Sequence, residues 1–138
     1  MIIVITGEME SGKSAMLEGL VAQHAPYDGL TNFWITSRPS DVSTDAFTGL
    51  LQGIVEHDGK NRCLALDENY YWFDSRSSLS NRNKLFCAAV ARVKADGGHV
   101  FITSQEFHFV DKRIRMRTDF ILRCERVENK EKMELGEA

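Results

Sequence analysis

The sequence predicts an α/β fold, in which a five-stranded parallel sheet carries helices on both faces of a single domain. Two observations predict it. Short runs rich in Val, Ile, Leu and Phe alternate with longer amphipathic segments, and strands that alternate with helices form parallel sheets. The chain of 138 residues is also long enough to build a full hydrophobic core without disulfides or a structural metal.

The first strand and the first helix are expected at the start of the chain. The run IIVIT (2–6) is β-branched throughout, as expected of a strand that helices cover on both faces. A helix is expected from about Gly12 to Gln23. Its buried side is predicted to contain Met16, Leu17, Leu20 and Val21. The segment NFWIT (32–36) is the second predicted strand, and Pro39 then disfavours helix at the residue before it.

The middle of the chain contains the second predicted helix and the third strand. The helix begins near Ser43 and ends before Gly59, because glycine is common just beyond helix ends. It is predicted to bury Phe47, Leu50, Leu51, Ile54 and Val55. The segment RCLALD (62–67) follows as the third strand.

The third helix and the last two strands complete the sheet. The helix is expected to begin at Leu79 or Ser80 and to stop at Gly97, the first of two glycines. The segments HVFITS (99–104) and DFILRC (119–124) are the fourth and fifth predicted strands.

The domain is expected to cover residues 1–126 and to be followed by a charged C-terminal tail, residues 127–138. The tail contains four Glu and two Lys, so its net charge is −2, and it lacks apolar periodicity.

The composition limits the classes of function. Apolar residues make up 43% and charged residues 27% of the chain, and the net charge of −3 gives no general attraction to nucleic acid or to anionic membranes. No signal peptide is recognised, and no apolar run approaches the roughly 18 residues that a membrane span needs. We therefore expect a reducing cytoplasm, or a particle assembled in one.

The three cysteines are expected to be buried, reduced thiols. Cys63, Cys87 and Cys124 are odd in number, lie among apolar residues and lack the spacing of a zinc site.

A glycine-bounded loop joins the first strand to the first helix. The segment GEMESGKS (7–14) matches the Walker A pattern G-x-x-x-x-G-K-[ST] and has the strand and helix that this pattern requires. The glycines let backbone N–H groups converge on phosphates, and the helix N-terminus adds its positive dipole end. Lys13 can reach the β- and γ-phosphates, and Ser14 can ligate Mg²⁺. The predicted nucleotide-binding residues are Gly7, Glu8, Met9, Glu10, Ser11, Gly12, Lys13, Ser14 and Ala15.

Two adjacent carboxylates follow the third strand. In CLALDE, four apolar residues precede Asp67 and Glu68. Asp67 is predicted to be the acid of a Walker B motif, which holds Mg²⁺ on the side opposite Ser14. Glu68 is predicted to be the general base that polarises a water. A base beside the metal acid favours hydrolysis.

The fourth strand ends in Ser104 and Gln105. In the sheet order that such nucleotide-binding proteins adopt, this strand lies between the first and third strands, so its carboxyl end faces the γ-phosphate. We predict that Gln105 can hydrogen-bond both that phosphate and the attacking water.

Together these three strand ends resemble the FtsK–HerA superfamily of P-loop NTPases. The matching segments are GEMESGKS, LALDENYYWFDSR and VFITSQEFHFVDKRIRMRTDFIL, and the resemblance spans about residues 1 to 126. Its compact viral members, the packaging ATPases and the zonular-occludens-toxin-like proteins of filamentous phages, are the most similar. The resemblance implies a Mg²⁺-dependent ATPase that packages or translocates DNA as a homo-oligomeric ring, with a hexamer as the expected form. Unlike many occludens-toxin-like proteins, the chain shows no membrane segment, so DNA and protein both remain open as the cargo.

Two other functions stay open. The loop also resembles that of thymidine kinases, which runs Gly-x-Met-x-Ser-Gly-Lys, but the cysteines of their zinc-held lasso have no counterpart here. The third alternative is a nucleotide-binding subunit without turnover.

Arginines are concentrated near the end of the domain. Residues 112–126 contain six basic and two acidic residues, a net charge of +4, which favours contact with DNA phosphates. Arg113, Arg115 and Arg117 would share one side of an extended segment. The candidates for an arginine finger on a neighbour's γ-phosphate are Arg76, Arg92 and Arg115. The aromatic run NYYWF (69–73) fits either base stacking or a core.

Overall fold

A computed structural model of the chain describes residues 1–8, 11–24, 32–35, 44–56, 63–67 and 81–125. Strands and helices alternate along it, as the sequence predicts. The strands are β1 (Ile2–Thr6), β2 (Asn32–Ile35), β3 (Cys63–Leu66), β4 (His99–Ser104) and β5 (Phe120–Arg123). The helices are α1 (Lys13–His24), α2 (Thr44–Glu56), α4 (Asn81–Ala95) and α5 (Lys112–Arg115), with a 3-10 turn, η3 (Phe107–Phe109).

The strands form one sheet in the order β2-β3-β4-β1-β5, and every neighbouring pair is parallel. The predicted α/β fold with a parallel sheet is therefore confirmed, and β4 lies between β1 and β3 as expected. The register pairs Thr6 with Ser104 and Leu66 with Ile102. The carboxyl ends of β1, β3 and β4 consequently meet at one edge of the sheet.

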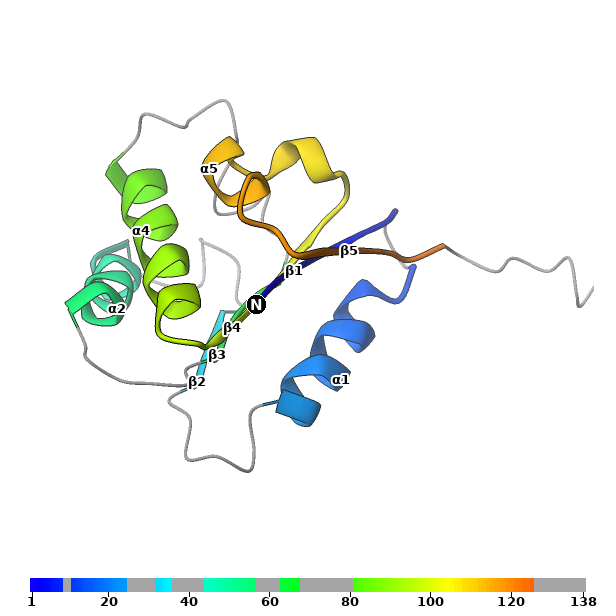
Figure 1. Cartoon of the computed structure of the whole chain (residues 1–138), viewed down its shortest axis with the longest axis horizontal. Helices are drawn as coiled ribbons and strands as arrows, with labels where there is room; N and C mark the ends of the chain where they lie inside the picture. The colour runs from blue at the N-terminus through cyan, green and yellow to red at the C-terminus, as the bar shows by residue number, and fades with distance from the viewer. Residues whose placement is uncertain (9–10, 25–31, 36–43, 57–62, 68–80, 126–138) are drawn as a thin grey trace, which may run out of the picture.

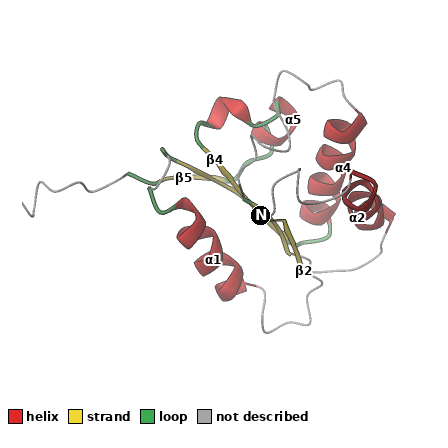
Figure 2. Cartoon of the chain, turned by 180° about the vertical axis from the view of Figure 1, so that it is seen from behind, coloured by secondary structure: helices red, strands yellow, loops and turns green. Residues whose placement is uncertain are grey.

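Helices cover both faces of this sheet. Helix α1 lies on one face, and α2, α4 and α5 lie on the other (Figures 1 and 2). Alternate residues of β1 divide between the two sides: Ile2 and Val4 join the larger apolar cluster, whereas Ile3 and Ile5 pack in the cluster beneath α1. This division explains why the strand is apolar on both faces.

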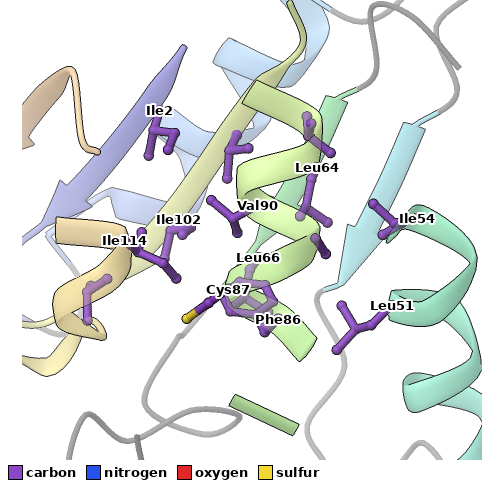
Figure 3. Packing of buried hydrophobic residues seen from close by; sticks show 14 of the residues in the cluster. Ile2, Leu51, Ile54, Leu64, Leu66, Phe86, Cys87, Val90, Ile102 and Ile114 are labelled. Carbon is purple, nitrogen blue, oxygen red and sulfur yellow. The ribbon is translucent and has the colours of Figure 1, made fainter. Parts of the chain in front are cut away.

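The larger cluster fixes α2, α4 and α5 to the sheet. Figure 3 shows Leu64 and Ile102 of the sheet in one layer with Phe86 and Val90 of α4, and all four are at most 1% exposed. Each fully buried side chain of this kind stabilises the fold by about 1.5–3 kcal/mol. The other labelled members include Leu51, Ile54, Leu66 and Ile114. Val55 packs against the cluster, and the side chains of Phe47 and Leu50 lie outside the described part.

Helix α4 ends where the glycine pair predicts. Gly97 has a φ of 80°, a left-handed conformation that glycine adopts without a steric penalty. Its N–H donates to Lys94 O at 3.1 Å, and the Gly98 N–H donates to Val93 O at 2.8 Å. These two bonds satisfy carbonyls of the last helical turn and direct the chain into β4.

Two of the three cysteines are buried, as predicted. Burial raises the pKa of the Cys63 thiol to about 11 and that of Cys87 to about 12. Both are therefore protonated at neutral pH. Cys124 is only partly buried.

The prediction that Met16 is buried is wrong, because its side chain is 43% exposed. Leu17 and Val21, four residues apart, face the sheet. Met16 lies about 100° around the helix from Leu17 and so falls beside the apolar stripe. Leu20, at the edge of that stripe, is partly buried.

The segment that carries the arginines begins as a helix, so the extended arrangement in which Arg113, Arg115 and Arg117 would share one side does not form. Asp111, only 2% exposed, caps α5 and accepts hydrogen bonds from Arg113 N at 2.9 Å and Arg113 Nη2 at 2.8 Å. These hydrogen bonds hold the pKa of Asp111 below its usual range. A capping aspartate therefore determines the local structure here.

Strand β5 lies at the edge of the sheet rather than in its core. It pairs with β1 alone, and its Phe120 and Ile121 are 56% and 51% exposed.

Candidate nucleotide-binding site

The three segments singled out in the sequence follow β1, β3 and β4 and so converge at one edge of the sheet. The loop after β1 is tied to the end of β4, since the Gly7 N–H donates to Gln105 O at 3.2 Å. Asp67 directly follows Leu66, whose partner in β4 is Ile102. This register brings Asp67 beside the next β4 residue, Thr103.

The first glycine of the loop is required by close contacts. A Cβ atom at Gly7 would lie 2.5 Å from Cys124 O and 2.6 Å from Ser11 Oγ, so a side chain there would force the backbone to shift. Gly12 has a φ of 93°, which side chains rarely permit. Met16 N donates to Gly12 O at 3.0 Å, so the second glycine already begins the hydrogen bonds of α1.

Ser11 carries an observation that bears directly on ligand fit. Its hydroxyl oxygen is buried and makes no hydrogen bond with the residues that the structure describes. A buried hydroxyl without a partner costs about 1–3 kcal/mol. A phosphate oxygen in the loop would accept this hydrogen bond, so the loop fits an anionic ligand better than it fits an empty turn.

Lys13 is buried at the base of the loop. Its side chain is 3% exposed, and Nζ donates to Gly7 O at 2.6 Å. A lysine ammonium carries three N–H donors. A phosphate bound in the loop would bring an opposite charge close to this ammonium, which suits a buried lysine.

The two predicted magnesium ligands touch one another. Ser14 Oγ, on the first turn of α1, donates to Asp67 Oδ2 at 2.8 Å. The other carboxylate oxygen, Asp67 Oδ1, accepts a hydrogen bond from Thr103 Oγ1 at 2.6 Å. A hydroxyl and a carboxylate in contact are the hard oxygen donors that Mg²⁺ prefers, and Mg²⁺ usually completes its shell with waters and substrate phosphates. Within the described ranges, no three His, Cys, Asp or Glu side chains form a metal cluster.

Thr103 was not identified from the sequence. It is fully buried, and the available signal was a polar residue directly after the apolar run Val100–Ile102 of β4. Gln105, by contrast, is exposed at the end of β4, where its backbone carbonyl holds the loop.

Of the arginine candidates, Arg92 lies away from the loop, Arg115 belongs to α5, and Arg76 falls outside the described residues. Arg92 is in the last turn of α4, where its Nε contacts Asp96 Oδ2 at 3.2 Å. Because α4 leads into the amino end of β4, Arg92 lies near the amino ends of the strands, whereas the loop lies at their carboxyl ends. At about 3.3 Å per strand residue, the length of β4 separates the two by roughly 20 Å. Arg115 Nε donates to Val110 O at 2.9 Å.

Several predicted site residues fall outside the described part of the chain. These are Met9, Glu10, Glu68, Arg76, the aromatic run 69–73 and the tail 127–138. Across the residues that are described, no helix is long and apolar enough to cross a membrane.

Comparison with solved structures identifies the fold. A chain of the HORMA:CdnC:Trip13 complex from E. coli MS115-1 has a TM-score of 0.66 at 15% identity, and the match covers 97% of this protein and 51% of that chain. The genome packaging NTPase B204 of Sulfolobus turreted icosahedral virus 2, in complex with AMP, has a TM-score of 0.62 at 17% identity. The match covers 99% of this protein and 80% of that chain. C. elegans PCH-2 has a TM-score of 0.61 at 18% identity, and the match covers 99% of this protein and 40% of PCH-2.

These likenesses show an ATPase-like α/β fold. B204 has also been solved in complex with ATP-gammaS, so a protein of this fold holds nucleotides. This protein spans about half of the first matched chain and less than half of PCH-2. No protein-family model matches the sequence, and no curated protein matches it at a significant level.

Proposed function

We propose that this protein binds ATP together with Mg²⁺ and hydrolyses it. The observation that carries the proposal is the contact of Ser14 Oγ with the Asp67 carboxylate at 2.8 Å, beside the buried Lys13 of a glycine-bounded loop. A serine hydroxyl, a carboxylate and an ammonium meet where three parallel strands end, which is where α/β sheets bind ligands.

Each residue has a role set by its chemistry. Lys13 and the loop N–H groups, among them those of Gly12 and Ala15, would hold the phosphates, and the Ser11 hydroxyl would donate to one of their oxygens. Gly7, whose N–H donates to Gln105 O, would let the loop turn close to the phosphates. Ser14 and Asp67 would hold Mg²⁺, whose charge would neutralise the β- and γ-phosphate oxygens. Glu68 would accept the proton of the attacking water, and Gln105 would orient that water. Glu8, Met9 and Glu10 would complete the loop between the two glycines.

The narrower proposal is a viral DNA-packaging or DNA-translocating motor of the FtsK–HerA superfamily. The three motifs support it, and so does the likeness to the B204 genome packaging NTPase over 99% of this chain. The exposed side chains of Lys112, Arg117 and Arg123 give the α5–β5 region a basic surface that suits DNA phosphates. A viral protein of this kind would act in the host cytoplasm or in the virion.

The test is the rate of ATP hydrolysis with and without single- and double-stranded DNA, at two salt concentrations. We expect hydrolysis that stops in EDTA, and stimulation by DNA of several-fold that weakens as salt rises, because phosphate contacts release counterions. If the rate of hydrolysis is the same with and without DNA at both salt concentrations, the DNA-motor proposal is wrong and only the ATPase proposal stands. Transfer of phosphate to thymidine would instead favour a nucleoside kinase, and bound ATP without phosphate release would favour a subunit without turnover.

A ring is proposed because ring ATPases of the resembled superfamily supply the arginine finger from the adjacent subunit. Arg92 lies at the far edge of the sheet, so a guanidinium that stabilises the γ-phosphate would come from a neighbouring copy, as in a hexamer. Arg115, with its Nε fixed on Val110 O, is a further candidate, as is Arg76.

Mixing two inactive variants tests the ring. Lys13→Ala and a variant of the finger arginine, for example Arg115→Ala, should each be inactive, yet their mixture should regain up to about a quarter of wild-type activity, because some mixed interfaces contain both intact groups. The matched control mixes Lys13→Ala with Asp67→Ala, which cannot build a complete site. If no variant of Arg76, Arg92 or Arg115 complements, and the specific rate is independent of protein concentration, the trans arrangement is wrong.

A further inference from the structure

The Asp67 carboxylate is held from two sides. Ser14 Oγ donates to Oδ2 at 2.8 Å, and Thr103 Oγ1 donates to Oδ1 at 2.6 Å. The first donor comes from α1 and the second from β4, so two separate elements fix one side chain at the end of β3. Of the two donors, only Ser14 belongs to the loop motif.

Thr103 is well suited to hold a neighbour in place. Its side chain is fully buried, and a β-branched residue in a strand has few accessible rotamers. The strand register fixes its position relative to Asp67, since Leu66 and Ile102 are partners in the parallel β3–β4 pair. The hydroxyl therefore presents its proton to Asp67 Oδ1 from a rigid backbone.

A purely structural role would not require this hydroxyl. Valine has nearly the same shape and a strong preference for strands, and Phe101 and Ile102, which precede Thr103 on the two faces of β4, are apolar and buried. A buried hydroxyl is costly unless it is hydrogen-bonded, and here the partner is the carboxylate expected to face the cation.

We propose that Thr103 is a positioning residue that orients the Asp67 carboxylate for a divalent cation, an inference that rests on the proposed Mg²⁺–nucleotide site. Thr103 touches neither nucleotide nor cation in this role and acts only through Asp67. Mg²⁺ demands near-ideal octahedral geometry, so a carboxylate free to rotate would bind it less well. Outer-shell partners of this kind typically change metal affinity by 10- to 100-fold.

The experiment compares Thr103→Val with Thr103→Ser. The readout is the Mg²⁺ concentration that gives half-maximal binding of a fluorescent, non-hydrolysable ATP analogue, with Mn²⁺ binding by electron paramagnetic resonance as a second measurement. We expect Thr103→Val to raise the required Mg²⁺ about 10-fold and to leave nucleotide affinity in EDTA unchanged. Thr103→Ser, which keeps the hydroxyl, should require a Mg²⁺ concentration within about threefold of that of the wild type.

A double variant separates positioning from packing. In an Asp67→Asn background the Thr103→Val substitution should have no further effect on the metal dependence, because the carboxylate it orients is gone. Equal metal affinity in wild type and Thr103→Val, or an equal loss in Thr103→Val and Thr103→Ser, would overturn the inference. Should Thr103→Val fail to fold, Thr103→Ala carries the same expectation.

The outcome also distinguishes this inference from the proposed function. If the wild type binds the analogue in a Mg²⁺-dependent way and Thr103→Val does not differ, only the role of Thr103 fails. If the wild type binds no nucleotide with or without Mg²⁺, the proposed function fails and the role of Thr103 fails with it.

Discussion

Replacing Lys13 with alanine is expected to weaken ATP binding at least about 30-fold and to abolish hydrolysis. The ammonium is 3% exposed and lies at the base of the loop, bonded to Gly7 O. Removing one partner of a buried, hydrogen-bonded charge pair costs about 2–5 kcal/mol, and each 1.4 kcal/mol is a factor of ten in affinity. Isothermal titration with ATP and Mg²⁺ measures the loss directly.

Two controls make this result specific. Lys84→Ala removes an exposed lysine from α4, on the other face of the sheet, and should leave ATP affinity unchanged. Lys13→Met keeps most of the buried side-chain volume, so a loss equal to that of Lys13→Ala assigns the effect to the charge. If folded Lys13→Ala protein binds ATP with an affinity within threefold of the wild type, Lys13 is not part of the binding site.

The fold and the loop were predictable from local patterns. A β-branched run such as 2–6, followed by glycines and a Lys-Ser pair, predicts the positions of a strand, a turn and a helix to within a few residues. The order β3-β4-β1 was expected from the sheet order that such nucleotide-binding proteins adopt, and the structure confirms it. The glycine at 97 was predicted to stop a helix for the same local reason, and its positive φ is observed.

The features that the sequence did not predict depend on contacts between distant segments. Met16 and Leu17 are consecutive apolar residues of one helix. Which of them is buried depends on the side of α1 that packs against the sheet. The helical start of the arginine segment depends on Asp111, whose capping bond outweighs the alternating pattern. Thr103 acquires a partner only because the register of β3 and β4 places it beside Asp67, 36 residues away in sequence.

Replacing Glu68 with glutamine is expected to lower the rate of ATP hydrolysis by at least about 100-fold while leaving ATP bound. A positioned general base typically contributes 10²–10⁴-fold to a rate, and glutamine keeps the shape of glutamate but cannot accept a proton. Glu68 directly follows Asp67 in the sequence. Single-turnover hydrolysis and equilibrium ATP binding, measured on the same preparation, separate the two effects.

The neighbouring carboxylate supplies the contrasting variant. Asp67 is bonded to Ser14 and Thr103, so Asp67→Asn should raise the Mg²⁺ requirement for nucleotide binding, whereas Glu68→Gln should leave that requirement unchanged. Two adjacent acids would then be assigned different roles, one in holding the cation and one in moving the proton. If Glu68→Gln hydrolyses ATP at the wild-type rate, Glu68 is not the base; if it changes the Mg²⁺ requirement as Asp67→Asn does, the two carboxylates share the cation, and the water must be activated by another group.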